Sequence, residues 1–180
     1  IEEIAGVDFG FTNPCCVLTI KRDYDNTFYV TDEYYKTGKT DANIAEYVSS
    51  MDFNKVYADP ENPNAVEELN KRGVNVMEVI KGKGSVANGI NKVRELFKAN
   101  RLKINKRCQN LIWELETYSY PEKKDLHNPD ENPIKENDHA CDALRYPLMM
   151  ITESYREPNR VFTPKPPVYG QGYGSFVQRP

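Results

Sequence analysis

Apolar residues in the first 36 positions fall into three short runs that are separated by turn residues. The runs are rich in β-branched and aromatic side chains, so we predict strands at Ile4–Asp8, Cys15–Lys21 and Thr27–Tyr35. Gly10 and Pro14 lie in the first connection, as expected of a turn. Three consecutive strands joined by short turns predict an antiparallel meander.

From residue 41 onward, stretches with helical spacing of apolar residues alternate with short apolar runs. Helices are predicted at Asp41–Ser50, Asn62–Gly73, Ser85–Asn100 and Cys108–Tyr120, and strands at Lys55–Pro60, Val74–Ile80 and residues 101–105. Asp41 is the expected N-cap of the first helix, Gly73 the C-cap of the second, and Trp113 a core residue. The alternation predicts parallel strands with crossover helices. The predicted fold is a mixed α/β sheet, an antiparallel meander followed by parallel strands, with helices on both faces.

The C-terminal part of the sequence changes character twice. Pro121–Asn137 is a polar stretch too long for an ordinary connection, and a last helix is predicted at Asp138–Met150. Residues 158–180 are rich in Pro, Gly and Tyr without periodicity, which predicts an extended tail for a partner. We therefore predict one folded domain over residues 1–157 and a tail over residues 158–180. Because the chain starts at Ile1 and leads straight into a strand, we expect the domain to belong to a longer protein.

Composition and charge exclude only a few classes of function. A chain of 180 residues with 39% hydrophobic residues suits one domain, and its net charge of −3 means that any contact with nucleic acid must use a local basic patch. The four cysteines show no C-x-x-C spacing, which argues against a disulfide framework or a zinc site. Without an 18-residue apolar stretch or a signal-peptide pattern, we expect a soluble protein that is not exported and does not contact a membrane.

Acidic residues occur where the predicted elements end. Asp8 and Asp59 close two predicted strands, at the edge of an open α/β sheet where ligands usually bind, and Asp142 shares a helix face with Asp138 and His139. Converging carboxylates repel one another unless divalent cations lie between them, and hard oxygen ligands suit Mg²⁺ or Mn²⁺. Two such ions could cleave a phosphodiester. Taken singly, each residue has a simpler explanation: Asp8 and Asp59 as turn residues, Asp138 as a helix N-cap and His139 as a solvated side chain.

Basic residues cluster in two predicted loops. Lys81 and Lys83 lie in "KGKGS" ahead of a predicted helix, and Lys123 and Lys124 lie in the long polar stretch. Lysines among glycines before a helix could hold phosphates of DNA, or they could simply keep a loop soluble.

Three segments, taken in order, carry a family resemblance. "GVDFGFTNP", "YADPENP" and "NDHACDALRYPL" resemble the nuclease domain of phage terminase large subunits, over nearly the whole chain up to residue 157. The resemblance implies an RNase H-like fold and an endonuclease that cuts double-stranded viral DNA with little sequence preference, using two Mg²⁺ or Mn²⁺ ions. It places metal ligands at Asp8, Asp59 and Asp142, and a histidine beside the metals at His139.

The same resemblance implies partners that the sequence does not contain. An ATPase domain of the same polypeptide should precede this one, yet no G-x-x-x-x-G-K-[ST] pattern occurs, so no motor activity is predicted for this chain. The terminase small subunit and the portal protein are implied as partners, and the host cytoplasm as the location.

Two other function classes stay open on the sequence alone. "DFGFTN" also resembles the first phosphate loop of actin-like and sugar-kinase ATPases, although a second such loop and a second domain are missing. A non-catalytic module that docks to DNA or to a portal would keep the basic loops without needing three acids at element ends.

Overall fold

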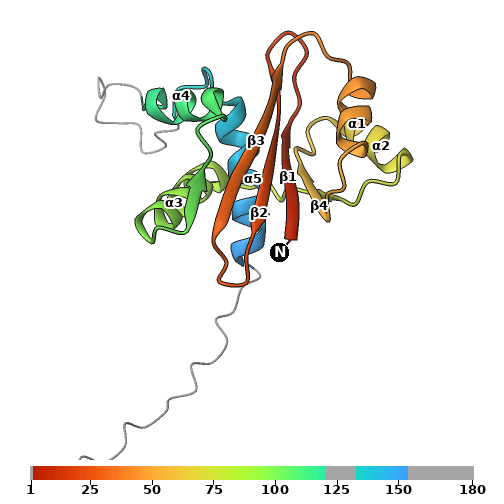
Figure 1. Ribbon diagram of the computed structural model, residues 1–180. Helices are drawn as coiled ribbons and strands as arrows, with labels where there is room; N and C mark the ends of the chain where they lie inside the picture. The colour runs from red at the N-terminus through yellow and green to blue at the C-terminus, as the bar shows by residue number, and fades with distance from the viewer. Residues whose placement is uncertain (1, 121–132, 154–180) are drawn as a thin grey trace, which may run out of the picture.

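One six-stranded sheet organises the computed structural model, which describes residues 2–120 and 133–153 (Figure 1). The sheet order is β5-β4-β1-β2-β3-β6, from the strands β1 (Glu2–Asp8), β2 (Cys15–Arg22), β3 (Phe28–Lys36), β4 (Lys55–Ala58), β5 (Val76–Glu78) and β6 (Leu102–Ile104). The first three strands are antiparallel, whereas β4, β5 and β6 run parallel to their partners β1, β4 and β3. The predicted meander followed by parallel strands is confirmed.

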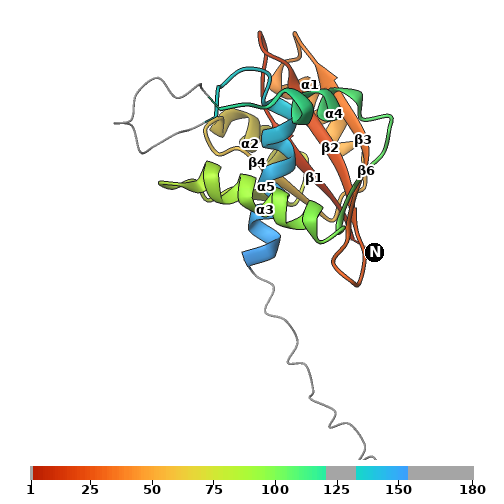
Figure 2. The ribbon, with the colours of Figure 1, turned by 90° about the vertical axis from the view of Figure 1, so that its left-hand side faces the viewer.

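Five helices cover both faces of the sheet, as predicted: α1 (Asp41–Ser49), α2 (Pro63–Lys71), α3 (Ser85–Lys98), α4 (Gln109–Thr117) and α5 (His139–Glu153). α1 and α2 lie on one face, and α3, α4 and α5 lie on the other, which Figure 2 turns toward the viewer. α5 packs against the central strands β1, β2 and β4. This is an RNase H-like mixed sheet with α5 laid across its middle.

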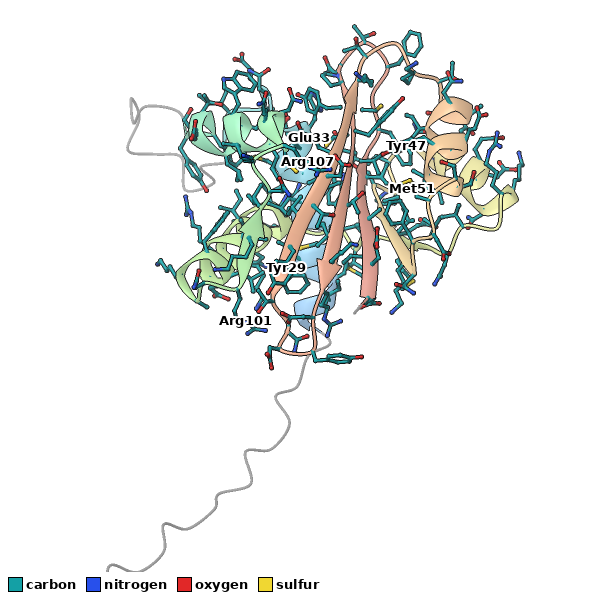
Figure 3. The ribbon with its side chains drawn as sticks, in the orientation of Figure 1. Tyr29, Glu33, Tyr47, Met51, Arg101 and Arg107 are labelled. Carbon is teal, nitrogen blue, oxygen red and sulfur yellow. The ribbon has the colours of Figure 1, made fainter. Side chains whose placement is uncertain are left out.

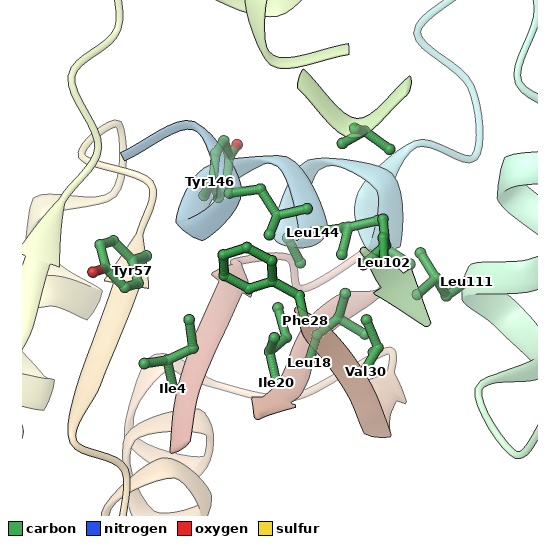
Figure 4. Packing of buried hydrophobic residues seen from close by; sticks show 14 of the residues in the cluster. Ile4, Leu18, Ile20, Phe28, Val30, Tyr57, Leu102, Leu111, Leu144 and Tyr146 are labelled. Atoms are coloured by element: carbon green, nitrogen blue, oxygen red, sulfur yellow. The ribbon is translucent and has the colours of Figure 1, made fainter. Parts of the chain in front are cut away.

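Alternation along the strands divides the buried residues into two cores. Ile4 and Leu18 face α5, while Ala5 and Val7 face α1 and α2. Figure 4 shows the first core, in which Leu144 and Tyr146 of α5 lie over the side chains of the sheet. Since successive side chains of a strand point to opposite faces, the same alternation directs Asp8, two positions beyond Gly6, toward the α5 side.

The backbone of α5 lies very close to β1 at Gly6. A Cβ atom on Gly6 would stand 1.8 Å from the carbonyl oxygen of Ala143 and 3.0 Å from Cδ of Pro147. Pro147 lies inside α5 and has no N–H to donate to the carbonyl of Ala143, one turn earlier. The missing side chain at Gly6 therefore lets the backbone of α5 lie directly on β1.

Local signals at helix ends were only partly correct. Thr40, not Asp41, is the N-cap of α1: its hydroxyl accepts from the amide of Asn43, whose side chain accepts from the Thr40 amide in a capping box. Gly73 does adopt the left-handed conformation expected after a helix, with φ of 76°, while the C-cap is Arg72. The predicted strand at Val74–Ile80 shortens to β5, three residues long.

Trp113 corrects a second expectation. Its side chain is 47% exposed, because α4 turns Leu111 and Glu114 inward and leaves Trp113 between them on the outer side. The buried residue on this part of α4 is Glu114, which contacts the start of α5.

Three further expectations concern the cysteines, membrane-spanning helices and the C-terminal segments. The four cysteines are free and buried. Among residues 2–120 and 133–153, no helix is both long and apolar enough to cross a bilayer. Most of the predicted polar stretch and the whole tail lie outside the described residues, and so do Lys123 and Lys124.

Candidate functional site

Three carboxylates meet at the hydroxyl of Tyr146. The hydroxyl oxygen lies 2.8 Å from Oδ2 of Asp59 and 3.4 Å from oxygens of both Asp8 and Asp142. Tyr146 itself is fully buried, whereas the three carboxylates remain partly open to solvent. The structure thus brings together the three acids that the sequence singled out, around a residue that it did not.

The fold explains why these acids converge. β1 and β4 are parallel neighbours in which Val7 pairs with Ala58, so Asp8 and Asp59 follow at the same edge of the sheet. Both point to the α5 side by the alternation of their strands. On α5, Asp142 and Tyr146 are four residues apart and therefore share one face.

His139 completes one side of the cluster. Its Nδ1 lies 2.9 Å from Oδ2 of Asp8, and this hydrogen bond raises the pKa of His139 above its ordinary value. The pKa of Asp8 is raised to about 6, mainly by burial and in spite of the opposing hydrogen bond from His139. Repulsion from Asp142 and Asp59 contributes to this rise. The metal-free site therefore carries an Asp8 charge that is only partly compensated.

Lys81 occupies the other side. Its Nζ lies 2.5 Å from Oδ2 of Asp59 and 3.2 Å from Oε1 of Glu61. Burial acts to raise the pKa of Asp59, but hydrogen bonds from Lys81, from the Glu61 amide and from Tyr146 outweigh it and lower the value. Lys81 is thus neither a free loop lysine nor, in this arrangement, available to a phosphate.

Arg145 holds the third carboxylate. Its Nη2 and Nε lie 2.7 and 3.2 Å from Oδ1 of Asp142, and its side chain is 5% exposed. The stem of Arg145 rests on α3 at Gly89, where a Cβ atom would stand 2.3 Å from its Cγ and Cδ. Its Nη1 is buried without a hydrogen-bond partner among the described residues. Asp142 is therefore oriented by a guanidinium that is itself fixed by packing.

Glu114, not the side chain of Asp138, satisfies the first turn of α5. Oε2 of Glu114 accepts from the amides of Ala140 and Cys141, at 2.7 and 2.9 Å, while Oε1 accepts from the hydroxyl of Tyr35. Asp138 contributes its backbone carbonyl to the amide of Asp142. Figure 3 shows the corresponding arrangement at α4, where Glu33 points from β3 to accept from the amides at its start. The N-cap interpretation of the Asp138 side chain is therefore wrong.

The cluster opens into a cleft of ≈1370 Å³. Asp138, half-buried with its pKa raised by burial and by Asp142, lines this cleft beside His139. Other lining residues come from the β1–β2 turn and from the start of α3. Lys83 is exposed in the loop that leads to α3. Tyr146, Arg145 and Glu114 were not predicted from the sequence; helical spacing of three and four residues from Asp142 was a usable signal for Arg145 and Tyr146, but not for Glu114.

The donor chemistry of the cluster fits divalent cations. No three His, Cys, Asp or Glu side chains of residues 2–120 and 133–153 are placed as the ligand set of a single ion. The carboxylate oxygens of Asp8, Asp59 and Asp142 are hard donors of the kind that Mg²⁺ and Mn²⁺ prefer, and in this structure they contact the hydroxyl of Tyr146, two cationic side chains and His139.

Comparison with known proteins gives a consistent family. A family model described as terminase RNase H-like domain matches residues 8–149. The terminase large subunit of Escherichia phage T5 is 29% identical over 164 residues, which cover 84% of this chain and 36% of the relative. The PBSX phage terminase large subunit of Bacillus subtilis (strain 168) is 29% identical over 150 residues, covering 79% and 33%. The chain spans about a third of the length of these curated relatives.

Solved structures agree with the sequence relatives. The nuclease domain of the large terminase of bacteriophage SPP1, solved with bound Mn, is 25% identical, with a TM-score of 0.65 over 81% of this chain and 84% of that one. The nuclease domain of the P22 large terminase is 22% identical, with a TM-score of 0.70 over 84% and 81%. A large terminase from a thermophilic bacteriophage reaches a TM-score of 0.75 at 24% identity, covering 84% of this chain and 39% of that one.

Proposed function

Because the chain belongs to the terminase RNase H-like domain family, we propose that it is a metal-dependent endodeoxyribonuclease domain that cuts double-stranded viral DNA with little sequence preference. The observation that carries the proposal is the meeting of Asp8, Asp59 and Asp142 around one hydroxyl at the edge of the sheet. The protein of SPP1 with bound Mn supports a divalent cation as the cofactor.

Two Mg²⁺ or Mn²⁺ ions would be held by the three carboxylates. Asp8 would be shared between them, and Asp59 and Asp142 would each complete one ion site. Bound there, the ions supply charge compensation for the attacking and leaving oxygens of a phosphodiester. Asp138 lines the same cleft and is proposed as an additional ligand.

The surrounding side chains prepare this site. His139 keeps its Nδ1 on Asp8, which fixes the ring and leaves Nε2 to orient a water molecule in the cleft or to serve as a further ligand. Arg145 holds Oδ1 of Asp142, so the other oxygen is turned to the shared centre. Lys81 lies on Asp59 and would have to share that carboxylate with an ion.

The family also suggests the setting of the domain. We propose that the polypeptide carries an ATPase domain, that it assembles with the terminase small subunit and the portal protein, and that it acts in the host cytoplasm. Residues 158–180 are assigned to such a partner rather than to cleavage, with the nuclease domain over residues 1–157. The ATP-binding and docking alternatives need no cluster of three acids.

Cleavage of supercoiled plasmid tests the function. The purified chain should nick and linearise plasmids of unrelated sequence in Mn²⁺ or Mg²⁺, and should be inactive in EDTA, because the carboxylates alone cannot compensate the charge of the reacting phosphate. ATP should not be required. If the chain is folded under the assay conditions and plasmid stays intact in both metals, the nuclease proposal is refuted.

Lys83 is proposed to contact a DNA phosphate. Replacing it with alanine should lower the log–log salt slope of duplex binding by about 1, since one phosphate contact is lost. Fluorescence anisotropy in Ca²⁺, which blocks cutting, measures the slope. Lys98→Ala, at the far end of α3, is the matched control and should leave the slope unchanged. Equal slopes for both variants would make Lys83 an ordinary surface residue.

A further inference from the structure

We infer that Tyr146 is a positioning residue of the metal site: its hydroxyl holds Asp8, Asp59 and Asp142 in the convergent arrangement that two ions require. The inference rests on the proposed function and adds to it a residue that binds neither metal nor DNA. Its effect on the metal is indirect, through its contacts with the three ligands.

The geometry of the hydroxyl carries this inference. A phenol has one proton to donate, and the 2.8 Å contact to Oδ2 of Asp59 is its bond. The two contacts of 3.4 Å place the same oxygen beside Asp8 and Asp142. No other side chain among the described residues forms hydrogen bonds or ion pairs with all three acids, whereas His139, Lys81 and Arg145 each hold one. Among these residues, the hydroxyl is thus the one group that contacts all three ligands, which lie at the end of β1, just after β4 and on α5.

Packing fixes the position of the Tyr146 hydroxyl. Tyr146 belongs to the core between α5 and the sheet and is the largest fully buried side chain (Figure 4). Two cations lie over its ring, with Nζ of Lys81 5.6 Å and the guanidinium carbon of Arg145 5.1 Å from the ring centroid. Each of those cations is paired with a carboxylate of the cluster, Asp59 or Asp142. The ring is thus in contact with both ion pairs as well as with the core.

An ordinary phenol is protonated at neutral pH, so the hydroxyl of Tyr146 is able to donate. Metal ligands depend on such hydrogen-bond partners for their orientation, and loss of one commonly costs 10–100-fold in metal affinity. Removing the hydroxyl should therefore leave each ligand with its own partner, His139, Lys81 or Arg145, but without the group that all three share.

Titration calorimetry with Mn²⁺ alone tests the inference on the full chain. Tyr146→Phe should bind Mn²⁺ about 10-fold more weakly than the wild type. The matched control is Tyr29→Phe, which also removes a phenol–aspartate hydrogen bond, to Asp23, but at the opposite end of the sheet (Figure 3). Tyr29→Phe should bind Mn²⁺ as the wild type does.

A second measurement separates positioning from simple stabilisation. Melting temperatures are compared in EDTA and in Mn²⁺: a smaller Mn²⁺-induced rise in Tyr146→Phe supports positioning, and a lower melting temperature with an unchanged rise overturns it. Cleavage should recover at high Mn²⁺, with the half-maximal concentration raised about 10-fold, since the ligands are intact.

The remaining outcomes are also decisive. Equal Mn²⁺ affinity in the wild type and Tyr146→Phe refutes the role of Tyr146 alone, whereas a wild-type chain that does not bind Mn²⁺ refutes the proposed metal site and this inference with it. If Tyr146→Phe does not fold, a chain with 4-aminophenylalanine at position 146 restores an N–H donor on the same ring. This chain should bind Mn²⁺ within about 3-fold of the wild type. A loss of Mn²⁺ affinity as large as that of Asp8→Asn would contradict the inference.

Discussion

Asp8→Asn should reduce plasmid cleavage at least about 1,000-fold while leaving the fold intact. The neutral amide cannot replace the carboxylate that both ions are proposed to share, and a loss of several kcal/mol of transition-state charge stabilisation corresponds to a change of this size. Asp142→Asn should have a similar effect, and Asp138→Asn a milder one. Cleavage assays in saturating Mn²⁺ measure the loss, with the exposed Asp52→Asn as the matched control.

The same substitution should stabilise the metal-free protein at neutral pH. The pKa of Asp8 in the folded protein, about 6, is above its ordinary value of 3.8, so the folded state binds the proton more tightly than the unfolded chain. Stability from this group is full below about pH 4 and is lost as the pH rises through 6, by about 3 kcal/mol at most. Asn does not ionise and avoids that loss, although it gives up the charge that His139 now faces.

Urea unfolding in EDTA at pH 4 and pH 8 measures this effect. The wild type and Asp8→Asn should be similar at pH 4, whereas the variant should be the more stable at pH 8. Adding Mn²⁺ should reverse the order, because only the wild type gains binding energy from the metal. Retained cleavage in the purified variant would remove Asp8 from the proposed ligand set, whereas lower stability than the wild type at pH 8 in EDTA would contradict the raised pKa of Asp8.

Patterns that depend on the immediate neighbours predicted the fold and the convergence of the three acids, whose role as ligands stays a prediction. The runs of apolar residues and the turns between them were sufficient for the meander, the parallel strands and the helices on both faces. Asp8 and Asp59 could be paired from the sequence because both end strands whose carboxyl ends share an edge. Asp142 followed from its place one turn inside a helix, where capping does not explain an acid.

Features set by contacts between distant elements could not be predicted in the same way. Asp138 has the local signature of an N-cap, but the amides at the start of α5 bind Glu114, whose side chain comes from α4. Helical spacing placed Trp113 inside because apolar residues surround it, and a buried glutamate on the same helix is the opposite of what hydrophobicity predicts. Lys81 reads as a loop lysine until the fold brings it to Asp59.

Gly6→Ala should destabilise the protein by at least about 3 kcal/mol, the largest effect on stability that we expect from a single methyl group. The added Cβ would stand 1.8 Å from a backbone carbonyl oxygen of Ala143, which cannot rotate away as a side chain could. Relief of the overlap requires α5 to move off β1, and overpacking against backbone exceeds the usual cost of about 1–3 kcal/mol. Gly82→Ala, which would meet nothing within 4 Å, is the matched control.

The position of Gly6 links this stability to the proposed chemistry. Gly6 lies two residues before Asp8, and Ala143 follows Asp142, so the contact that fails is the one that aligns the two carboxylates. Molecules of Gly6→Ala that remain folded at low temperature should therefore cleave plasmid more slowly than the wild type at equal folded concentration. Urea unfolding in EDTA gives the stability, and cleavage at 10 °C, corrected for the folded fraction by circular dichroism, gives the activity. A variant with wild-type stability would show that α5 does not rest on β1 at Gly6, whereas reduced stability with full cleavage would show that the spacing of Asp8 and Asp142 does not depend on this contact.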